Sequence, residues 1–323
     1  MERNSKHVLI GGGSGFIGSA LADALRARGD RVTVLSRTPG VGRITWEDVS
    51  ERGIPACDAV VNLAGEHILQ PGKRWTAGYR DEVIKSRVDT TRTLVDAINA
   101  HEAPPEVFVS TAGKCFYGTR SMAPGQAYPE LDEDSQPMGM DFPAELVGQW
   151  ETAADHLDHD RVRHVRVRIG IVLGAVRKQS FLGRLWRIGR ARGVLPLVRL
   201  PFCLGLGARF GSGMQPFPWI HIDDMVGILL HVIDHPETDG RYNAVSPGIV
   251  SNRDFTAAFG RSLRRPVVWS VPAWLVNVAI GQERASILLE GQNVVPKRTL
   301  AAGYSFRYPT IDGALEDLVE ITI

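Results

Sequence analysis

The sequence has few cysteines, almost no net charge and no long apolar run. Its 323 residues include three cysteines, and Cys57, Cys115 and Cys203 have neither the spacing of a disulfide framework nor that of a metal site. Such a pattern is typical of reduced proteins, so we expect the cytoplasm or another reducing compartment, and no bound metal. The formal net charge of +1 gives no overall electrostatic attraction to nucleic acid or to an anionic membrane.

A membrane-spanning segment is also missing. The most apolar stretch, residues 194–206, is interrupted by Pro196, Arg199 and Pro201, which makes it too short and too broken to cross a bilayer. The first residues are polar and lead directly into a strand, so we expect no secretory signal. We therefore expect neither nucleic acid nor a membrane as a partner, and a small-molecule substrate instead.

A glycine-rich turn between a strand and a helix is the most informative feature present. His7–Gly11 is predicted as a buried strand and Phe16–Arg28 as a helix, with Gly12, Gly15 and Gly18 between and within them in a G-x-x-G-x-x-G pattern. The first glycine permits the tight turn, the second lets a pyrophosphate approach, and the third lets the helix pack closely. We expect a dinucleotide to contact residues Gly12, Ser14, Gly15, Phe16, Ile17 and Gly18. The alternative is a glycine turn without a ligand.

The next strand indicates which dinucleotide binds. Arg31–Ser36 is β-branched, and an acidic residue near its end would accept hydrogen bonds from the ribose 2′-hydroxyl of NAD. No acidic residue stands there. Ser36 and Arg37 take that place and can donate to a 2′-phosphate, which favours NADP(H). The alternative is that Arg37 is an ordinary solvated arginine.

Strands and helices alternate in the first half of the chain, which predicts an α/β fold with a doubly wound parallel sheet of the Rossmann type. We place the remaining elements as strands Ala59–Asn62, Glu106–Ser110 and His164–Ile169, and helices Tyr79–His101 and Phe142–His156. We expect residues 1–174 to form the NADP-binding domain, with residues 218–235 returning to it. Residues 175–323 are expected to form a smaller C-terminal α/β domain on the substrate side.

Several motifs together resemble the extended short-chain dehydrogenase/reductases, and within them the atypical epimerase-family branch of the NAD-dependent epimerase/dehydratase superfamily. The resemblance covers about residues 7–320 and rests on GGGSGFIG, VNLAGE, Arg74-Trp75, Trp150-Glu151, PWIHIDD and LLEGQNVVPKRTLAAGY. It implies that Leu63, Ala64 and Gly65 pass beside the nicotinamide ribose. It also implies that the long helix brings Glu82 and Arg87 toward the cofactor. Homodimers are common in this fold, so a homodimer stays open.

The proton relay typical of this family is absent. Enzymes of the family that this chain resembles typically carry a Tyr-x-x-x-Lys pair. In that pair the lysine lowers the tyrosine pKa, so that the tyrosine hydroxyl exchanges a proton with the substrate. At the aligned place stand Phe142 and Leu146, which carry no proton.

Three other side chains are weak catalytic candidates: Thr111, Tyr117 and His221. Ser110 lies beside Thr111, and Lys114 is a further titratable group expected at the crevice. Each has a plainer explanation, because Tyr117 can be a packed loop aromatic, Lys114 a solvated cation and His221 a hydrogen-bonded structural histidine.

A basic stretch lies between residues 177 and 199. The spacing of Phe181, Leu185 and Ile188 predicts an amphipathic lid helix with a solvated basic face, and an acidic or nucleic-acid partner is the alternative.

Two functions are consistent with these sequence features. The first is an NADP(H)-dependent oxidoreductase or epimerase-like enzyme acting on an unidentified small substrate. The second is a catalytically inactive NADP(H)-binding module that senses the cofactor or docks a partner, since the cofactor motifs are present and the proton relay is missing.

Overall fold

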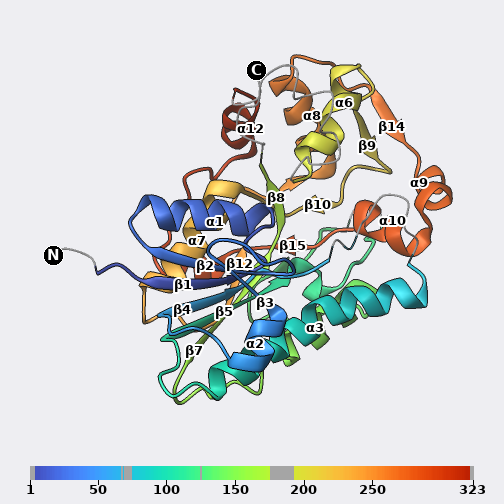
Figure 1. Ribbon diagram of the computed structural model, residues 1–323. Coiled ribbons are helices and arrows are strands. Elements are labelled where there is room, and N and C mark those ends of the chain that lie inside the picture. Colours follow the sequence, from blue (N-terminus) through green and yellow to red (C-terminus); the bar gives the residue numbers. More distant parts are fainter. Residues whose placement is uncertain (1–3, 67, 69–74, 124–125, 175–192, 321–323) are drawn as a thin grey trace. The chain divides into compact units, whose positions relative to one another are not determined.

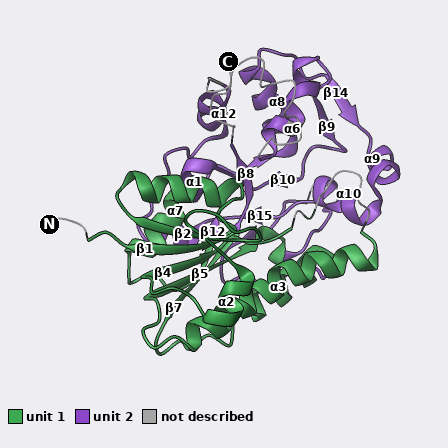
Figure 2. Cartoon of the chain, in the orientation of Figure 1, with its two compact units in different colours: residues 1–116, 142–168, 226–242 green, residues 117–141, 169–225, 243–323 purple. Residues whose placement is uncertain are grey.

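The computed structural model describes residues 4–66, 68, 75–123, 126–174 and 193–320 (Figure 1). The chain divides into two compact units that are nearly equal in length (Figure 2). Unit 1 holds residues 1–116, 142–168 and 226–242, and unit 2 holds residues 117–141, 169–225 and 243–323. The predicted boundary at residue 174 differs from this division, since residues 117–141 belong to unit 2 and only the later part of residues 218–235 belongs to unit 1.

A sheet of seven strands among the described residues forms the centre of unit 1, in the order β12-β7-β5-β4-β1-β2-β3. The strands are β1 (His7–Gly11), β2 (Arg31–Ser36), β3 (Arg43–Thr45), β4 (Ala59–Asn62), β5 (Val107–Gly113), β7 (Arg163–Ile169) and β12 (Gly240–Ala244). β3, β2, β1, β4 and β5 run parallel. The chain passes from β1 to β2 and β3 on one side and then to β4 on the other. β1 therefore lies at the point where the strand order reverses, where open α/β sheets bind ligands.

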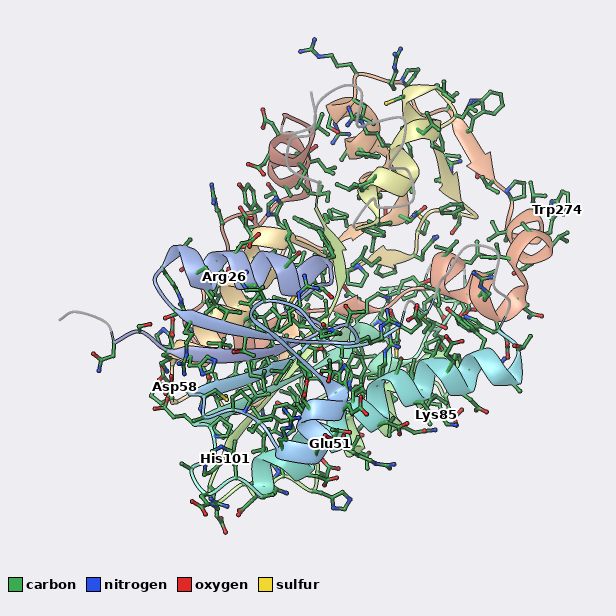
Figure 3. All side chains as sticks on the ribbon, viewed as in Figure 1. Arg26, Glu51, Asp58, Lys85, His101 and Trp274 are labelled. Carbon is green, nitrogen blue, oxygen red and sulfur yellow. The ribbon has the colours of Figure 1, made fainter. Side chains whose placement is uncertain are left out.

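Helices cover both faces of this sheet, which confirms the predicted Rossmann-type doubly wound fold. α1 (Phe16–Ala27) and α7 (Ile222–Asp234) lie on one face, and α2 (Trp46–Arg52), α3 (Ala77–Asn99) and α4 (Phe142–Thr152) lie on the other (Figure 1). The bounds of β1, β2 and β4 are those that the sequence predicts. Charged side chains such as Arg26, Glu51 and Lys85 are exposed on the outer faces of α1, α2 and α3 (Figure 3).

The core of unit 1 explains why the central strands β1 and β4 are largely apolar along their length. Leu9, Val60 and Phe108 are completely buried, and the buried Leu94 and Ile98 of α3 pack against them. Parallel strands covered on both faces leave no solvent side, so alternation of polar and apolar residues disappears. The sheet is thus rigid where its carboxyl ends carry the glycine turn.

Unit 2 consists of short strand pairs and helices. β8 (Ile171–Leu173) pairs with β11 (Trp219–His221) in a sheet of their own, and β12 is the edge strand of the large sheet, next to β7. The other pairs are β9 (Ala208–Phe210) with β14 (Trp269–Val271), β10 (Pro216–Phe217) with β13 (Val250–Ser251), and β6 (Glu130–Leu131) with β15 (Asn293–Val294).

The unit 2 core packs α8 (Asn252–Ser262) against α12 (Ile311–Glu320), with Phe255, Phe259 and Leu315 buried between them. The other described helices are η1 (Lys114–Tyr117) at the unit boundary, α6 (Leu195–Cys203), α9 (Ala273–Ile280), α10 (Gln282–Leu289) and α11 (Lys297–Ala301).

The predicted lid helix lies largely outside the described residues, since α6 begins only at Leu195. None of the helices in the described part of the chain is long and apolar enough to cross a membrane.

Candidate functional site

The turn after β1 is fixed by both neighbouring strands. Gly12 has a φ of +72°, a left-handed conformation that favours glycine. A Cβ at this position would lie 2.7 Å from the carbonyl oxygen of Leu63, which follows β4. The Gly12 N–H donates to the Leu35 carbonyl of β2 at 3.1 Å, and the Gly15 N–H donates to the Gly12 carbonyl at 2.8 Å. Glycine at position 12 is therefore required by the fold itself.

Gly15 differs from its neighbours, because the fold alone does not require a glycine there. It is exposed, has an ordinary φ of −73° and caps the N-terminus of α1 without a side-chain hydrogen bond. A Cβ would lie 3.1 Å from the Gly12 carbonyl oxygen, and among the described residues beyond its chain neighbours no other atom comes within 4 Å of it. Gly18, by contrast, is buried, and a Cβ there would clash with the Gly12 carbonyl oxygen.

The first turn of α1 also contains no acidic residue. A helix start leaves backbone N–H groups without helical acceptors and carries a partial positive charge. Ser14 is exposed, whereas Phe16 and Ile17 are half-buried, so the backbone of this turn is reachable from solvent. The geometry fits a bound pyrophosphate, which would occupy the open space above Gly15.

The segment after β4 forms the second side of this site. The Leu63 N–H donates to the Gly11 carbonyl at 2.9 Å, and the Asn62 Oδ1 accepts from the Ala64 N–H at 3.1 Å. The Asn62 amide also donates to the buried Thr91 of α3, to which the Trp150 indole of α4 donates as well. Leu63, Ala64 and Gly65 are thereby held beside the glycine turn.

Arg87 braces this segment from α3. Its guanidinium donates to the Glu66 carbonyl at 2.7 Å and to the Val83 carbonyl at 3.2 Å, and it packs over the Trp150 ring at 5.2 Å. Burial lowers the pKa of Arg87 to about 10, while the Glu66 carboxylate raises it. A Cβ at Gly65 would lie 3.0 Å from the guanidinium carbon. Glu82, the other α3 residue that the family resemblance brings toward the cofactor, is exposed.

Ser36 and Arg37 follow β2 at the same edge of the sheet. Ser36 is buried and its hydroxyl donates to the Thr38 carbonyl at 2.5 Å, so it shapes the chain after the strand. The Arg37 side chain is 86% exposed, and its Nη1 lies 3.6 Å from a carboxylate oxygen of Glu66. The Arg37 guanidinium can therefore reach an anion bound at this edge.

The residues at the place of the missing proton relay are buried in the apolar packing of α4. Phe142 meets the Trp75 ring edge-on at 5.0 Å, and Leu146 packs with Tyr79 and Val83 of α3. This cluster holds α3 and α4 together and contains no acid or base in contact with the ends of β1 or β4.

Thr111 and its neighbour Ser110 are engaged in the core of unit 1. The Thr111 hydroxyl donates to the Asn62 carbonyl at 2.7 Å, and Ser110 shares a hydrogen bond of 2.8 Å with the His164 ring. Burial lowers the pKa of His164 to about 3, so the ring is neutral in the folded protein at physiological pH. Lys114 is also buried.

The other two catalytic candidates lie in unit 2. Tyr117 is completely buried, with its hydroxyl 2.9 Å from both the Asp132 carbonyl and the Asn243 side-chain oxygen. The His221 Nδ1 accepts from the Asp223 N–H at 3.0 Å, which puts the proton of the neutral ring on Nε2, 3.3 Å from an Asp317 oxygen. Burial lowers the pKa of His221, although the nearby carboxylates oppose the shift. Nδ1 is therefore occupied as an acceptor, and the long contact with Asp317 is what the described residues offer to Nε2.

A buried ion pair in unit 1 has no obvious signal in the sequence. Arg168 of β7 is 1% exposed, and its Nε and Nη2 donate to the two carboxylate oxygens of Glu151 at 2.7 and 2.9 Å. Its guanidinium also lies 3.4 Å from the centre of the Phe116 ring. Trp150-Glu151 is one of the family motifs, but an arginine within a strand is usually taken as exposed.

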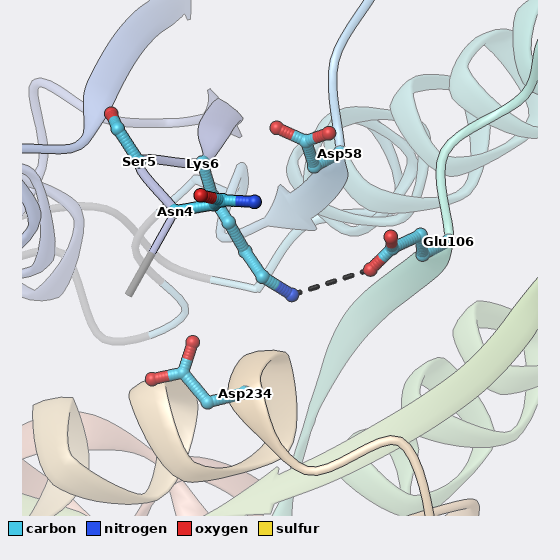
Figure 4. Close-up of a pocket in the computed structure, with 6 residues that line it drawn as sticks. All are labelled: Asn4, Ser5, Lys6, Asp58, Glu106 and Asp234. Atoms are coloured by element: carbon cyan, nitrogen blue, oxygen red, sulfur yellow. Dashed lines mark hydrogen bonds and ion pairs between the residues drawn. The ribbon is translucent and has the colours of Figure 1, made fainter. Parts of the chain in front are cut away.

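Unit 1 also has a hollow of about 400 Å³ at the opposite, amino edge of the sheet (Figure 4). It is lined by Asn4, Ser5, Lys6, Asp58, Glu106 and Asp234, and Lys6 pairs with Glu106 at 3.3 Å. None of these residues belongs to the glycine turn. Within the described ranges, no group of three or more His, Cys, Asp or Glu side chains could hold a metal ion.

Comparisons with known proteins show the family of this chain. The model of the "NAD dependent epimerase/dehydratase family" matches residues 8–246, and that of a "Domain of unknown function (DUF1731)" matches residues 271–318. The epimerase family protein SDR39U1 of Bos taurus is 45% identical over 97% of this chain and 99% of its own length.

Two solved structures are similar over nearly the whole chain. The crystal structure of human epimerase family protein SDR39U1 (isoform2) with NADPH is 43% identical, with a TM-score of 0.87 over 97% of this chain and 99% of that chain. The nucleoside-diphosphate sugar epimerase of Corynebacterium glutamicum is 27% identical, with a TM-score of 0.73 over 98% of this chain and 58% of that chain.

Proposed function

Because the chain belongs to the NAD dependent epimerase/dehydratase family, we propose that it binds NADP(H) at the glycine turn and acts as an epimerase-like oxidoreductase on a small substrate. Gly15 carries the cofactor proposal, since a glycine stands at an exposed turn where the described part of the chain does not itself require one. The similar human protein was crystallised with NADPH, which supports the same cofactor here.

The residues for each part of the cofactor follow from their positions. Backbone groups of residues 12–18 would hold the pyrophosphate, Arg37 would bind the 2′-phosphate, and Leu63 to Gly65 would border the nicotinamide ribose. Arg87 would act indirectly, by holding the segment from Leu63 to Gly65 in place. A contact between Glu82 and the cofactor is proposed only from the family resemblance. When bound, the nicotinamide supplies or accepts a hydride.

The first test concerns the choice between the two nicotinamide cofactors. Arg37→Ala should weaken NADPH binding by about 1.5–3 kcal/mol, the range for a hydrogen bond to a charged group, and leave NADH binding nearly unchanged. Titration calorimetry with both cofactors measures this difference. Arg26→Ala, which removes an exposed arginine from α1, is the control for overall charge. Equal losses for NADPH and NADH in the Arg37 variant would contradict a contact with the 2′-phosphate.

A second candidate function is NADP(H) binding without turnover. The observation that favours it is the burial of Thr111, Tyr117 and His221, each of which already has a protein partner for its polar side chain. General acid–base assistance contributes roughly 10²–10⁴-fold to such reactions. A site without a side-chain relay depends on water or on the substrate itself for the proton.

We therefore expect slow or undetectable turnover even with the cofactor fully bound. Oxidation of NADPH should be followed at saturating cofactor across a panel of carbonyl compounds and nucleotide sugars. Fast turnover of one substrate would favour the enzyme over the binding module. If such turnover also survived Thr111→Ala, Tyr117→Phe and His221→Ala, none of these three side chains would be the proton donor.

A further inference from the structure

The Arg37–Glu66 ion pair crosses the carboxyl end of β1. Gly11 lies opposite Leu35 of β2 on one side and opposite Asn62 of β4 on the other. Arg37 directly follows β2, and Glu66 comes four residues after the end of β4. A pair formed between these residues therefore spans the place where the glycine turn begins. An anion held by Arg37 at this edge must meet the Glu66 carboxylate as well.

The Glu66 backbone is fixed by hydrogen bonds to α3, whereas the Arg37 side chain is largely exposed. The Glu66 N–H donates to the Ser86 hydroxyl at 3.1 Å, and its carbonyl accepts from Arg87 at 2.7 Å, so α3 fixes the Glu66 backbone on both sides. The Glu66 side chain is 20% exposed, whereas that of Arg37 is 86% exposed. Their separation of 3.6 Å is longer than a hydrogen bond, so the pair is loose and the Arg37 N–H donors stay available.

We propose that Glu66 is a specificity-determining residue that competes with the 2′-phosphate of NADP(H) for the Arg37 guanidinium. The inference rests on the proposed binding of NADP(H). A phosphate offers three acceptor oxygens and nearly two negative charges, and it forms bidentate hydrogen bonds with arginine. It therefore draws Arg37 away from the carboxylate. Glu66 then loses its ion-pair partner, so phosphate binding is opposed by the loss of the Arg37–Glu66 pair.

This competition acts on one cofactor only. NADH carries a ribose hydroxyl in place of the phosphate, so the Arg37–Glu66 pair has no anionic competitor when NADH binds. Glu66 thus lowers the affinity for NADPH relative to NADH, in the opposite direction to Arg37. The balance between the two side chains sets how strongly the site prefers NADPH.

Titration calorimetry with NADPH and NADH on the full chain tests this role. Glu66→Gln keeps the size and polarity of the side chain but removes its charge. It should tighten NADPH binding by about two- to fivefold, the size expected for one exposed ion pair, and leave NADH binding unchanged. Glu51→Gln removes the same charge from the exposed face of α2 and should change neither affinity (Figure 3).

The double variant Arg37→Ala with Glu66→Gln separates competition from a general charge effect. Without Arg37 there is nothing to compete for, so Glu66→Gln should give at most a small further gain in NADPH affinity. Unchanged or weaker NADPH binding by Glu66→Gln alone, with circular dichroism showing an intact fold, would overturn the competition while the NADP(H) site stands. A wild-type chain that binds neither cofactor would overturn both proposals.

Discussion

Gly15→Val should abolish dinucleotide binding and leave the fold intact. The backbone at Gly15 has a φ of −73°, which valine adopts without strain, and among the described residues outside its chain neighbours the new Cβ meets the Gly12 carbonyl oxygen alone. The valine methyl groups would fill the exposed space proposed for the pyrophosphate. We expect NADPH affinity to fall by about 100-fold or more, because the phosphates can no longer approach the turn. Calorimetric titration measures the loss.

Two other glycines serve as controls for this substitution. Gly148→Val, in α4, places a side chain in open space away from the turn and should leave both binding and stability nearly unchanged. Gly12→Val should damage the fold itself, since its left-handed backbone and the contact with Leu63 leave no room for a side chain. Far-UV circular dichroism separates these cases. NADPH affinity retained in Gly15→Val would show that the phosphates bind elsewhere.

Loss of either partner of the Arg168–Glu151 pair should be the most destabilising substitution of a charged residue in unit 1. Arg168→Met leaves the Glu151 carboxylate, whose side chain is 10% exposed, with Arg241 at 3.8 Å as its one remaining cation among the described residues. Removing one member of a buried ion pair typically costs about 3–5 kcal/mol, because the other charge stays desolvated. We expect a loss of that size in the free energy of unfolding, measured by urea denaturation.

The double variant Arg168→Met with Glu151→Leu identifies the cause. It removes both charges and should recover most of the stability, since a buried pair adds little over apolar residues of similar volume. Arg26→Ala breaks the exposed Arg26–Asp23 pair of α1 and should cost less than about 1 kcal/mol. A double variant no more stable than the single variants would point to lost packing against Phe116 instead of an unpaired charge.

The sequence predicts the elements around the glycine turn well, and the reason is physical. β1 and β4 are buried along their whole length and almost entirely apolar, and β2 is rich in β-branched residues, so each strand stands out from the glycine and polar residues around it. β3 and α2 were not predicted, because elements of three and seven residues are too short to show periodicity. The start of α2 does carry a local signal, the capping box of Thr45 and Asp48.

The site was predicted less completely than the fold. The glycines and Arg37 follow from spacing along the chain. The role of Glu66 depends on two loops that meet only because β2 and β4 both pair with β1. Arg168 was missed for a related reason: its charge is matched by a glutamate on another element, and no pattern within β7 shows that pairing.

The hydrogen bonds of Thr91 have a consequence for how the site opens. Asn62 at the end of β4 and Trp150 of α4 both donate to this one hydroxyl, which is itself completely buried. Because the Ala64 N–H donates to the Asn62 side chain, the loop after β4 is linked at its first residues, through Asn62 and Thr91, to α3 and α4. We therefore expect local unfolding at Leu63 and Ala64 to be coupled to that of the two helices. A ligand that contacts the loop thus protects the backbone amides of both helices, including those far from any atom of the ligand.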